Sequence, residues 1–158
     1  MTEAANITVP LIRHVAGLDL PGWLPLWEGY NRFYGRDGAT ALPPLVTETT
    51  WQRFLDPSEP MFALVAEVDG QLAGLAHYLF HRSTTALSSV CYLQDLFTAE
   101  PFRGKGIAGM LIEQVYEEAK AVGVQRVYWQ THETNFVAQR LYEKLAERSG
   151  FIVFRKLL

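Results

Sequence analysis

A short glycine-rich run between a strand and a helix constrains the fold of this chain more than any other feature. Strand-like residues 89–98 lead into Ala99-Glu-Pro-Phe-Arg-Gly-Lys-Gly, and an amphipathic helix follows over 107–122. Glycines allow a tight turn and a close approach of ligand to backbone. A helix start offers unpaired N–H groups and the positive end of the helix dipole. With Arg103 and Lys105 in the same turn, the run predicts an anion site, most naturally for phosphate.

Hydrophobic periodicity predicts the elements around this run. Apolar side chains recur at helical spacing over 23–34, 47–55, 107–122 and 134–149. Strand patterns cover 6–16, 61–68, 71–81, 89–98, 124–132 and 151–158. Asp69-Gly70 favours a tight hairpin, and the strand–helix–strand unit over 89–132 favours a parallel pair with a right-handed crossover. This order predicts a mixed sheet with helices on its faces.

Composition narrows the class of protein. The chain has 158 residues, of which 49% are hydrophobic, and a net charge of −3. This suits one globular domain over 6–158 after an N-terminal extension of 1–5, and it disfavours a nucleic-acid partner. No apolar run is long enough to span a membrane, and no Cys/His spacing suits zinc. We therefore expect a cytoplasmic protein without a bound metal.

Three interpretations of the glycine-rich run compete. It could simply start a helix. Gly104, Gly106 and Gly109 also match the G-x-G-x-x-G pattern of dinucleotide-binding proteins. In those proteins the first glycine follows the strand almost directly, whereas here residues 100–103 intervene and the upstream strands are expected to be antiparallel. The third interpretation is a cradle for the pyrophosphate of coenzyme A.

The third interpretation rests on a family resemblance. Arg103, Gly106 and Ala108 resemble the signature of the GNAT superfamily of N-acetyltransferases, which is Arg or Gln, two residues, Gly, one residue, then Gly or Ala. Residues 93–98 are similar to that family's fourth strand, and the element order fits nearly the whole chain. The resemblance implies an α/β (α+β) GNAT fold, with a mixed, mostly antiparallel twisted sheet of about six to seven strands flanked by about four helices. It also implies acetyl-coenzyme A as co-substrate.

The resemblance assigns cofactor contacts to matched positions. Main-chain groups would hold the pyrophosphate at Arg103, Gly104, Lys105, Gly106, Ile107 and Ala108. The strand end at Leu96, Phe97 and Thr98 would contact the acetyl group and pantetheine, and the main chain of Leu96 would stabilise the developing oxyanion.

The second half of the implied site follows the next strand. Asn135 and Ala138 are similar to family positions that contact the cofactor, and Tyr142 resembles the family's general acid. Such an acid is needed because a thiolate must leave when an amine attacks a thioester. Cys91, the only cysteine, would act only in a covalent acyl-enzyme route, which direct transfer does not need.

The acceptor side is less defined. An alkyl amine with a pKa of about 10.4 must lose a proton before it attacks. Gln94 stands where polyamine acetyltransferases that resemble this chain carry Glu, and an amide is not a base. Strand alternation is expected to point Asp95 to the opposite face. Glu28 and His132 are candidate bases or water-mediated relays, with a surface or packing role as the alternative.

An aromatic stripe precedes this region. Trp23, Trp27, Tyr30 and Tyr34 share one helical face, which predicts packing on the sheet, with Trp27, Glu28 or Tyr30 reaching the acceptor. The C-terminal part is most similar to the histone-and-polyamine acetyltransferase subgroup. This implies a small basic amine as acceptor and a homodimer aided by apolar residues 151–154. A longer acyl-coenzyme A as donor, or a non-catalytic acyl-coenzyme A sensor, remain alternatives.

Overall fold

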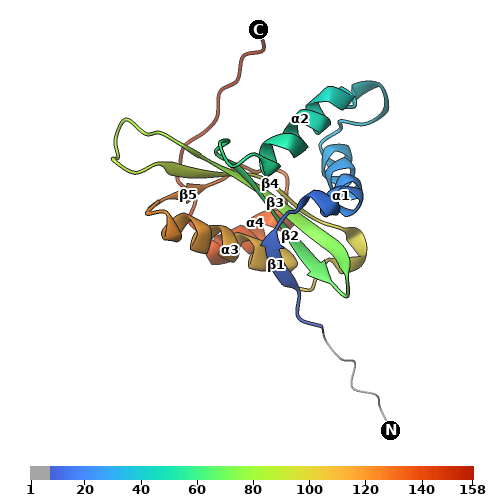
Figure 1. Cartoon of the computed structure of the whole chain (residues 1–158). Coiled ribbons are helices and arrows are strands. Elements are labelled where there is room, and N and C mark those ends of the chain that lie inside the picture. Colours follow the sequence, from blue (N-terminus) through green and yellow to red (C-terminus); the bar gives the residue numbers. More distant parts are fainter. Residues whose placement is uncertain (1–7) are drawn as a thin grey trace.

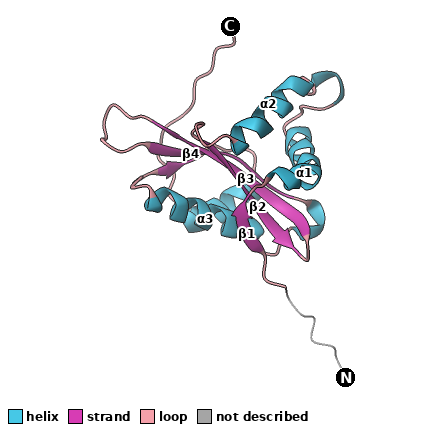
Figure 2. Ribbon diagram, viewed as in Figure 1, coloured by secondary structure: helices cyan, strands magenta, loops and turns pink. Residues whose placement is uncertain are grey.

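The computed structural model describes residues 8–158, and its centre is one mixed sheet between two pairs of helices (Figure 1, Figure 2). The five strands, in both sheet and chain order, are β1 Leu11–His14, β2 Met61–Val68, β3 Gln71–His81, β4 Val90–Thr98 and β5 Val127–Tyr128. The helices are α1 Leu20–Phe33, α2 Pro44–Leu55, α3 Ile107–Ala121 and α4 Phe136–Leu145. Neighbouring strands are antiparallel except β4 and β5, which are parallel as predicted.

The β2–β3 hairpin forms as the Asp69-Gly70 pair predicts. Asp69 and Gly70 have φ angles of 50° and 76°, the left-handed backbone that a two-residue hairpin turn needs. Val68 pairs with Gln71 directly across the turn. The observed bounds of both strands equal the predicted ranges, because the alternating side chains and the turn chemistry are both local signals.

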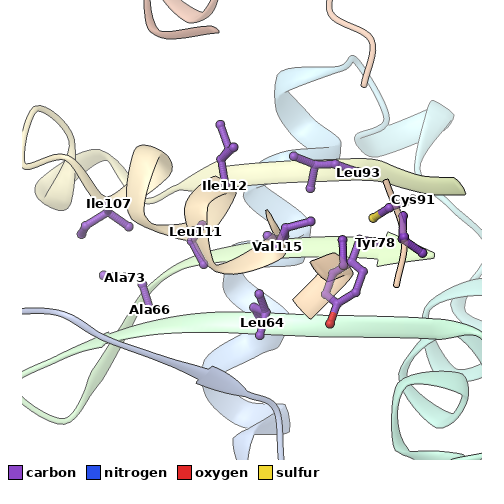
Figure 3. Close-up of a cluster of buried hydrophobic side chains, with 13 residues drawn as sticks. Leu64, Ala66, Ala73, Tyr78, Cys91, Leu93, Ile107, Leu111, Ile112 and Val115 are labelled. Carbon is purple, nitrogen blue, oxygen red and sulfur yellow. The ribbon is translucent and has the colours of Figure 1, made fainter. Parts of the chain in front are cut away.

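Helix α3 closes one face of the sheet. Ile107, Leu111 and Val115 recur every four residues and are buried, together with Ile112. They pack against buried side chains of β2, β3 and β4, including Leu64 (Figure 3). Burying each such aliphatic side chain contributes about 1.5–3 kcal/mol. Side chains of α4 also pack on this cluster, so α3 and α4 share one face.

Helices α1 and α2 cover the opposite face with a second, aromatic cluster. Trp23 is fully buried and packs on Trp27 and on Trp51 of α2, with ring centroids 5.7 and 4.9 Å apart. Trp27 stacks on Tyr30 at 5.6 Å. The predicted stripe therefore fixes α1 on the sheet, and Leu75 of β3 belongs to the same cluster.

Several expectations need correction. The described sheet has five strands, not six or seven. Residues 151–158 form no strand, because an apolar run becomes a strand only where it pairs with another strand. The C-terminal end of the chain lies away from the body (Figure 1). The strand predicted over 124–132 pairs only at Val127–Tyr128, and α4 spans Phe136–Leu145 rather than 134–149. Residues 1–7, with the predicted extension and the start of the first strand, lie outside the described residues.

Candidate active site

The parallel strands β4 and β5 part soon after they pair. Their register holds only at Cys91↔Val127 and Tyr92↔Tyr128, whereas β4 continues to Thr98. No later described strand pairs with this side of β4. A parted strand leaves main-chain donors and acceptors on which an extended ligand can bind as an added strand. Leu96, Phe97 and Thr98, the residues predicted to contact the acetyl group and pantetheine, lie on this stretch.

The glycine-rich run has the geometry of an anion cradle. Gly104 and Gly106 have φ angles of 75° and 79°, where residues with a Cβ are strained. Gly106 is the N-cap of α3 and no side chain caps this helix. The first helical hydrogen bond runs from the N–H of Met110 to the carbonyl of Gly106, so the N–H groups of the first turn stay available to a ligand.

The side chains of Arg103 and Lys105, the two cations of the run, contact groups close to it in the chain. The Nε–H of Arg103 donates to the carbonyl of Thr98 at 3.1 Å, and its guanidinium lies 5.7 Å from the Phe97 ring centre. The ammonium of Lys105 lies 5.4 Å from the Phe102 ring centre. The buried Oγ1 of Thr98 has no partner among the described residues. An orphaned hydroxyl, open N–H groups and two cations at one strand end fit a phosphorylated ligand.

The second predicted cofactor segment begins at the N-cap of α4 and continues along this helix. The Asn135 side chain caps this helix by accepting from the N–H of Ala138 at 3.4 Å. The Tyr142 ring packs edge-on against Trp129 at 5.4 Å. Burial raises the pKa of the Tyr142 phenol to about 12, and Tyr34 adds a smaller effect. Its phenol therefore carries a proton at neutral pH, as a general acid must.

A cavity of about 680 Å³, here called the acceptor cavity, lies between α1, α2 and the β3–β4 pair. Four of the predicted acceptor residues line it, namely Trp27, Tyr30, Gln94 and His132. Glu28 is exposed on α1 and does not line this cavity. A neighbouring cavity of about 880 Å³ runs along another side of α1, from Leu18 to Phe33, and reaches Arg103. The acceptor candidates therefore gather in one place, with Glu28 as the exception.

Asp95 also lines the acceptor cavity, so the predicted orientation of this side chain was wrong. β3 pairs His77 with Asp95 and Tyr78 with Leu93, which leaves Gln94 as an extra residue in a β-bulge. A bulge breaks the two-residue alternation of side chains. Leu93 therefore packs towards α3, while both Gln94 and Asp95 face the acceptor cavity.

Asp95 is the end of a buried polar chain that sequence reasoning missed. The indole Nε1–H of Trp23 donates to Nε2 of His77 at 2.9 Å, and Nδ1 of His77 lies 2.9 Å from Oδ2 of Asp95. Because an indole can only donate, Nε2 accepts and Nδ1 carries the proton towards the carboxylate. The exposed fractions of His77 and Asp95 are 2% and 7%. The imidazole thus fixes a buried carboxylate at the cavity wall.

Phenols surround this carboxylate. Burial raises the pKa values of Tyr30, Tyr34 and Tyr92, and the negative charge of Asp95 raises each further. All three residues line the acceptor cavity. A buried carboxylate among aromatic faces is an environment that attracts a cation, since both the charge and the ring quadrupoles favour it.

Other predicted features lie away from this chemistry. Cys91 is fully buried in the cluster under α3, and burial raises the pKa of its thiol to about 12. Among residues 8–158, no three His, Cys, Asp or Glu side chains are grouped so that they could hold a metal ion. None of the helices in this part of the chain is long and apolar enough to cross a membrane.

Comparison with known proteins identifies the class. The model of the Acetyltransferase (GNAT) family matches residues 23–146. The chain therefore belongs to the GNAT family and is an N-acetyltransferase. Enzymes of this family use acetyl-coenzyme A. The antiparallel β1–β4 meander also rules out the doubly wound parallel sheet that the dinucleotide interpretation requires.

Relatives cover nearly the whole chain. A D-amino-acid N-acetyltransferase of Saccharomyces cerevisiae is 34% identical over 148 residues, which is 92% of this chain and 89% of the relative. The fold matches a ribosomal-protein-alanine N-acetyltransferase from Brucella melitensis with a TM-score of 0.76 at 21% identity, over 95% of this chain and 99% of that one. It also matches the AAC(6')-Iy enzyme in complex with a coenzyme A–acetylneamine bisubstrate analogue, with a TM-score of 0.80 at 19% identity, over 96% and 99% of the two chains.

Proposed function

We propose that this N-acetyltransferase acetylates the primary amine of a small basic molecule, such as an amino acid, a polyamine or a related amine. The observation that carries the proposal is the buried carboxylate of Asp95 in an aromatic cavity. Asp95 directly precedes Leu96, the residue whose main chain is expected to contact the acetyl group. An ammonium group is the cation that such a site would take. The carboxylate would attract it and receive the proton that the nitrogen must lose before it attacks.

The donor would bind along the parted β4 edge. Main-chain groups from Arg103 to Ala108 would hold the pyrophosphate, and Leu96, Phe97 and Thr98 would hold the acetyl end. Acetyl-coenzyme A supplies the thioester, whose C–S bond breaks as the C–N bond forms. A main-chain N–H near Leu96 would stabilise the negative charge that develops on the acetyl oxygen. Asn135 and Ala138 would contact the cofactor chain from α4.

Tyr142 would supply a proton to the departing sulfur. Its raised pKa of about 12 keeps the phenol protonated, and the effect of Tyr34 on this pKa places the phenol near the acceptor cavity that Tyr34 lines. His132, Gln94, Trp27 and Tyr30 would shape the acceptor side, since all line its cavity. Cys91 would take no part, because its thiol is buried in the opposite cluster.

The relatives agree with an amine acceptor of this kind. The yeast relative is named for D-amino acids, and a shorter match, 38% identical over 73 residues, is an aminoglycoside N(6')-acetyltransferase of Serratia marcescens. A place in the histone-and-polyamine subgroup is the finer assignment that we propose from the C-terminal half and the first helix.

We also propose that the protein is a homodimer. The tail exposes Phe151, Ile152 and Phe154 to the extent of 92%, 77% and 88%, and contiguous apolar side chains on a surface favour association. Light scattering coupled to gel filtration should give twice the mass of one chain, and removal of residues 151–158 should give a monomer. A monomeric full chain would overturn this proposal.

The function is tested in two measurements. Acetyl-coenzyme A should raise the melting temperature, and thiol release should then follow addition of amines from a panel of amino acids, polyamines and aminoglycosides. A longer acyl-coenzyme A that is used faster than the acetyl form would favour the alternative donor. Stabilisation by acetyl-coenzyme A without thiol release for any amine would indicate a sensor and would overturn the proposed function.

A further inference from the structure

The acceptor cavity carries positive as well as negative charge. Arg36, in the segment between α1 and α2, lines the same cavity as Asp95. Its guanidinium lies 5.5 Å from the ring centres of both Tyr30 and Tyr34. Its Nε–H donates to Oδ1 of Asn31 at 2.6 Å. The two rings and this hydrogen bond hold the guanidinium at the cavity wall.

Asn31 makes this position rigid. It is 5% exposed, and its Nδ2–H donates to the carbonyl of Trp27 at 2.8 Å. The main-chain N–H of Arg36 donates to the carbonyl of the same Asn31 at 2.9 Å. Arg36 is therefore tied to the last turns of α1 through both its main chain and its side chain, and its terminal nitrogens are left for another partner.

Asp95 and Arg36 form no ion pair with each other. In the described part of the chain, no carboxylate lies within 4.0 Å of the Arg36 nitrogens, and His77 is the one basic side chain within 4.0 Å of the Asp95 carboxylate. The phenol of Tyr30 also hydrogen-bonds to Asp95, which helps to raise the pKa of Tyr30. Both charges act on the phenols of Tyr30 and Tyr34, since Asp95 raises and Arg36 lowers the pKa values of both. Charges of opposite sign that line one cavity without pairing with each other suit a ligand that carries both complements.

We propose that the cavity binds a zwitterionic amino acid, with its amine at Asp95 and its carboxylate at Arg36. This inference rests on the proposed acetyl transfer and narrows its acceptor class. A guanidinium binds a carboxylate through two parallel hydrogen bonds, which gives it geometric specificity. A polyamine would instead place further ammonium groups near the Arg36 cation, so like charges would repel it.

The test compares each acceptor with a partner that lacks only the carboxylate charge. Initial rates of thiol release are measured for D- and L-methionine, phenylalanine, histidine and lysine, for their carboxamides, and for spermidine. Arg36→Gln should lower kcat/KM for the preferred amino acid by roughly 10- to 100-fold, because a hydrogen bond to a charged group is lost. It should change kcat/KM for the matching carboxamide by less than about 3-fold.

Matched variants separate the role of Arg36 from general charge and folding effects. Arg53→Gln on α2 removes an exposed positive charge outside the cavity and should leave both rates unchanged. Arg155 also lines the cavity, and Arg155→Gln should lower the amino-acid rate less than Arg36→Gln does. Arg36→Lys keeps the charge without the two-pronged geometry and should give an intermediate loss. Thermal unfolding verifies that each variant is folded.

The outcomes divide clearly. A loss restricted to amino acids in Arg36→Gln supports the inference, as does amino-acid binding by calorimetry that weakens in the same variant. Equal losses for acids and carboxamides, a selective loss in Arg155→Gln instead, or a wild-type preference for spermidine would overturn it while leaving acetyl transfer intact. The absence of thiol release with every amine would overturn the proposed function itself.

Discussion

Nδ1 of His77 lies 2.9 Å from Oδ2 of Asp95, and the two side chains are almost fully buried where the acceptor cavity meets the aromatic cluster. Trp23 holds the other imidazole nitrogen. This arrangement resembles the way a buried carboxylate orients a catalytic histidine, but with the roles exchanged, since here the histidine orients the carboxylate. Trp23, His77 and Asp95 therefore form one hydrogen-bonded unit at the wall of the acceptor cavity.

Asp95→Asn should lower kcat/KM for the acceptor by roughly 100-fold or more, because an amide neither attracts an ammonium nor takes its proton. Asn keeps an oxygen that can accept from His77, so the fold should be retained. Stabilisation by acetyl-coenzyme A in thermal unfolding should stay unchanged. Glu117→Gln, which removes an exposed carboxylate paired only with Lys120, is the control. Wild-type rates in Asp95→Asn would exclude Asp95 from the mechanism.

His77→Gln and His77→Leu should differ. Gln can still accept from Trp23 and donate to Asp95, whereas Leu leaves the indole N–H and the carboxylate without their partner. Each unsatisfied buried group costs about 1–3 kcal/mol, so the Leu variant should unfold at clearly lower denaturant concentration. Its acceptor KM should also rise more than that of the Gln variant. Identical KM values in two folded variants would show that His77 does not position Asp95.

Tyr142→Phe should reduce kcat by roughly 100-fold and leave the acceptor KM nearly unchanged, since only the proton donor is lost. The pH profile gives a second check. A general acid acts in its protonated form, and burial raises the pKa of Tyr142 to about 12. Titration of this phenol should therefore not reduce kcat between about pH 7 and 10. An alkaline decline in that range that disappears in Tyr142→Phe would contradict the raised pKa, whereas a wild-type kcat in Tyr142→Phe would exclude Tyr142 as the general acid.

Gly106→Ala should weaken acetyl-coenzyme A binding, because a residue with a Cβ at φ 79° is strained by about 1–2 kcal/mol and would shift the turn. Gly123→Ala is a matched control, since Gly123 follows the other end of α3 with φ 77° and open space at its Cβ position. Both variants should lose similar stability, and only the first should raise the KM for acetyl-coenzyme A. An equal KM in the two would place the pyrophosphate elsewhere.

Cys91→Ala should keep most of the wild-type turnover, because the thiol is buried among apolar side chains and burial raises its pKa to about 12. A small loss of stability is expected from the cavity that the missing sulfur leaves. Mass spectrometry after incubation with acetyl-coenzyme A should show no acetyl group on Cys91. A stable acetyl-cysteine, or a large loss of turnover, would favour a covalent route.

Local patterns in the sequence predicted much of this molecule. The hairpin at Asp69-Gly70, the apolar face of α3 and the glycine-rich run depend on residues that are close in the chain, so periodicity and turn chemistry were enough. His77 and Arg36 gave no such signal. The role of His77 comes from partners that lie 18 and 54 residues away along the chain. That of Arg36 comes from a cavity lined by residues of two helices, three strands and the segments around them.

Two errors have the same physical origin. Alternation placed Asp95 on the wrong face because a bulge inserts Gln94, and a bulge depends on the neighbouring strand rather than on the strand itself. Apolar residues 151–158 favoured a strand, but a strand forms only where it pairs, and these residues pair with neither edge strand of the described sheet. Both the bulge and the missing strand depend on how separate segments of the chain pair, and the residue pattern within one segment says little about that pairing.

The bulge at Gln94 also allows the residues that contact the acceptor amine to vary separately from those that contact the acetyl donor. Because the ladder with β3 resumes at Asp95, we expect that the side chain at position 94 can change in size or charge without moving the main chain at Leu96, which we propose contacts the donor. Variation at this single position could therefore retune acceptor choice while the handling of the thioester is preserved. A mutational library for new amines would be most economical if it began there.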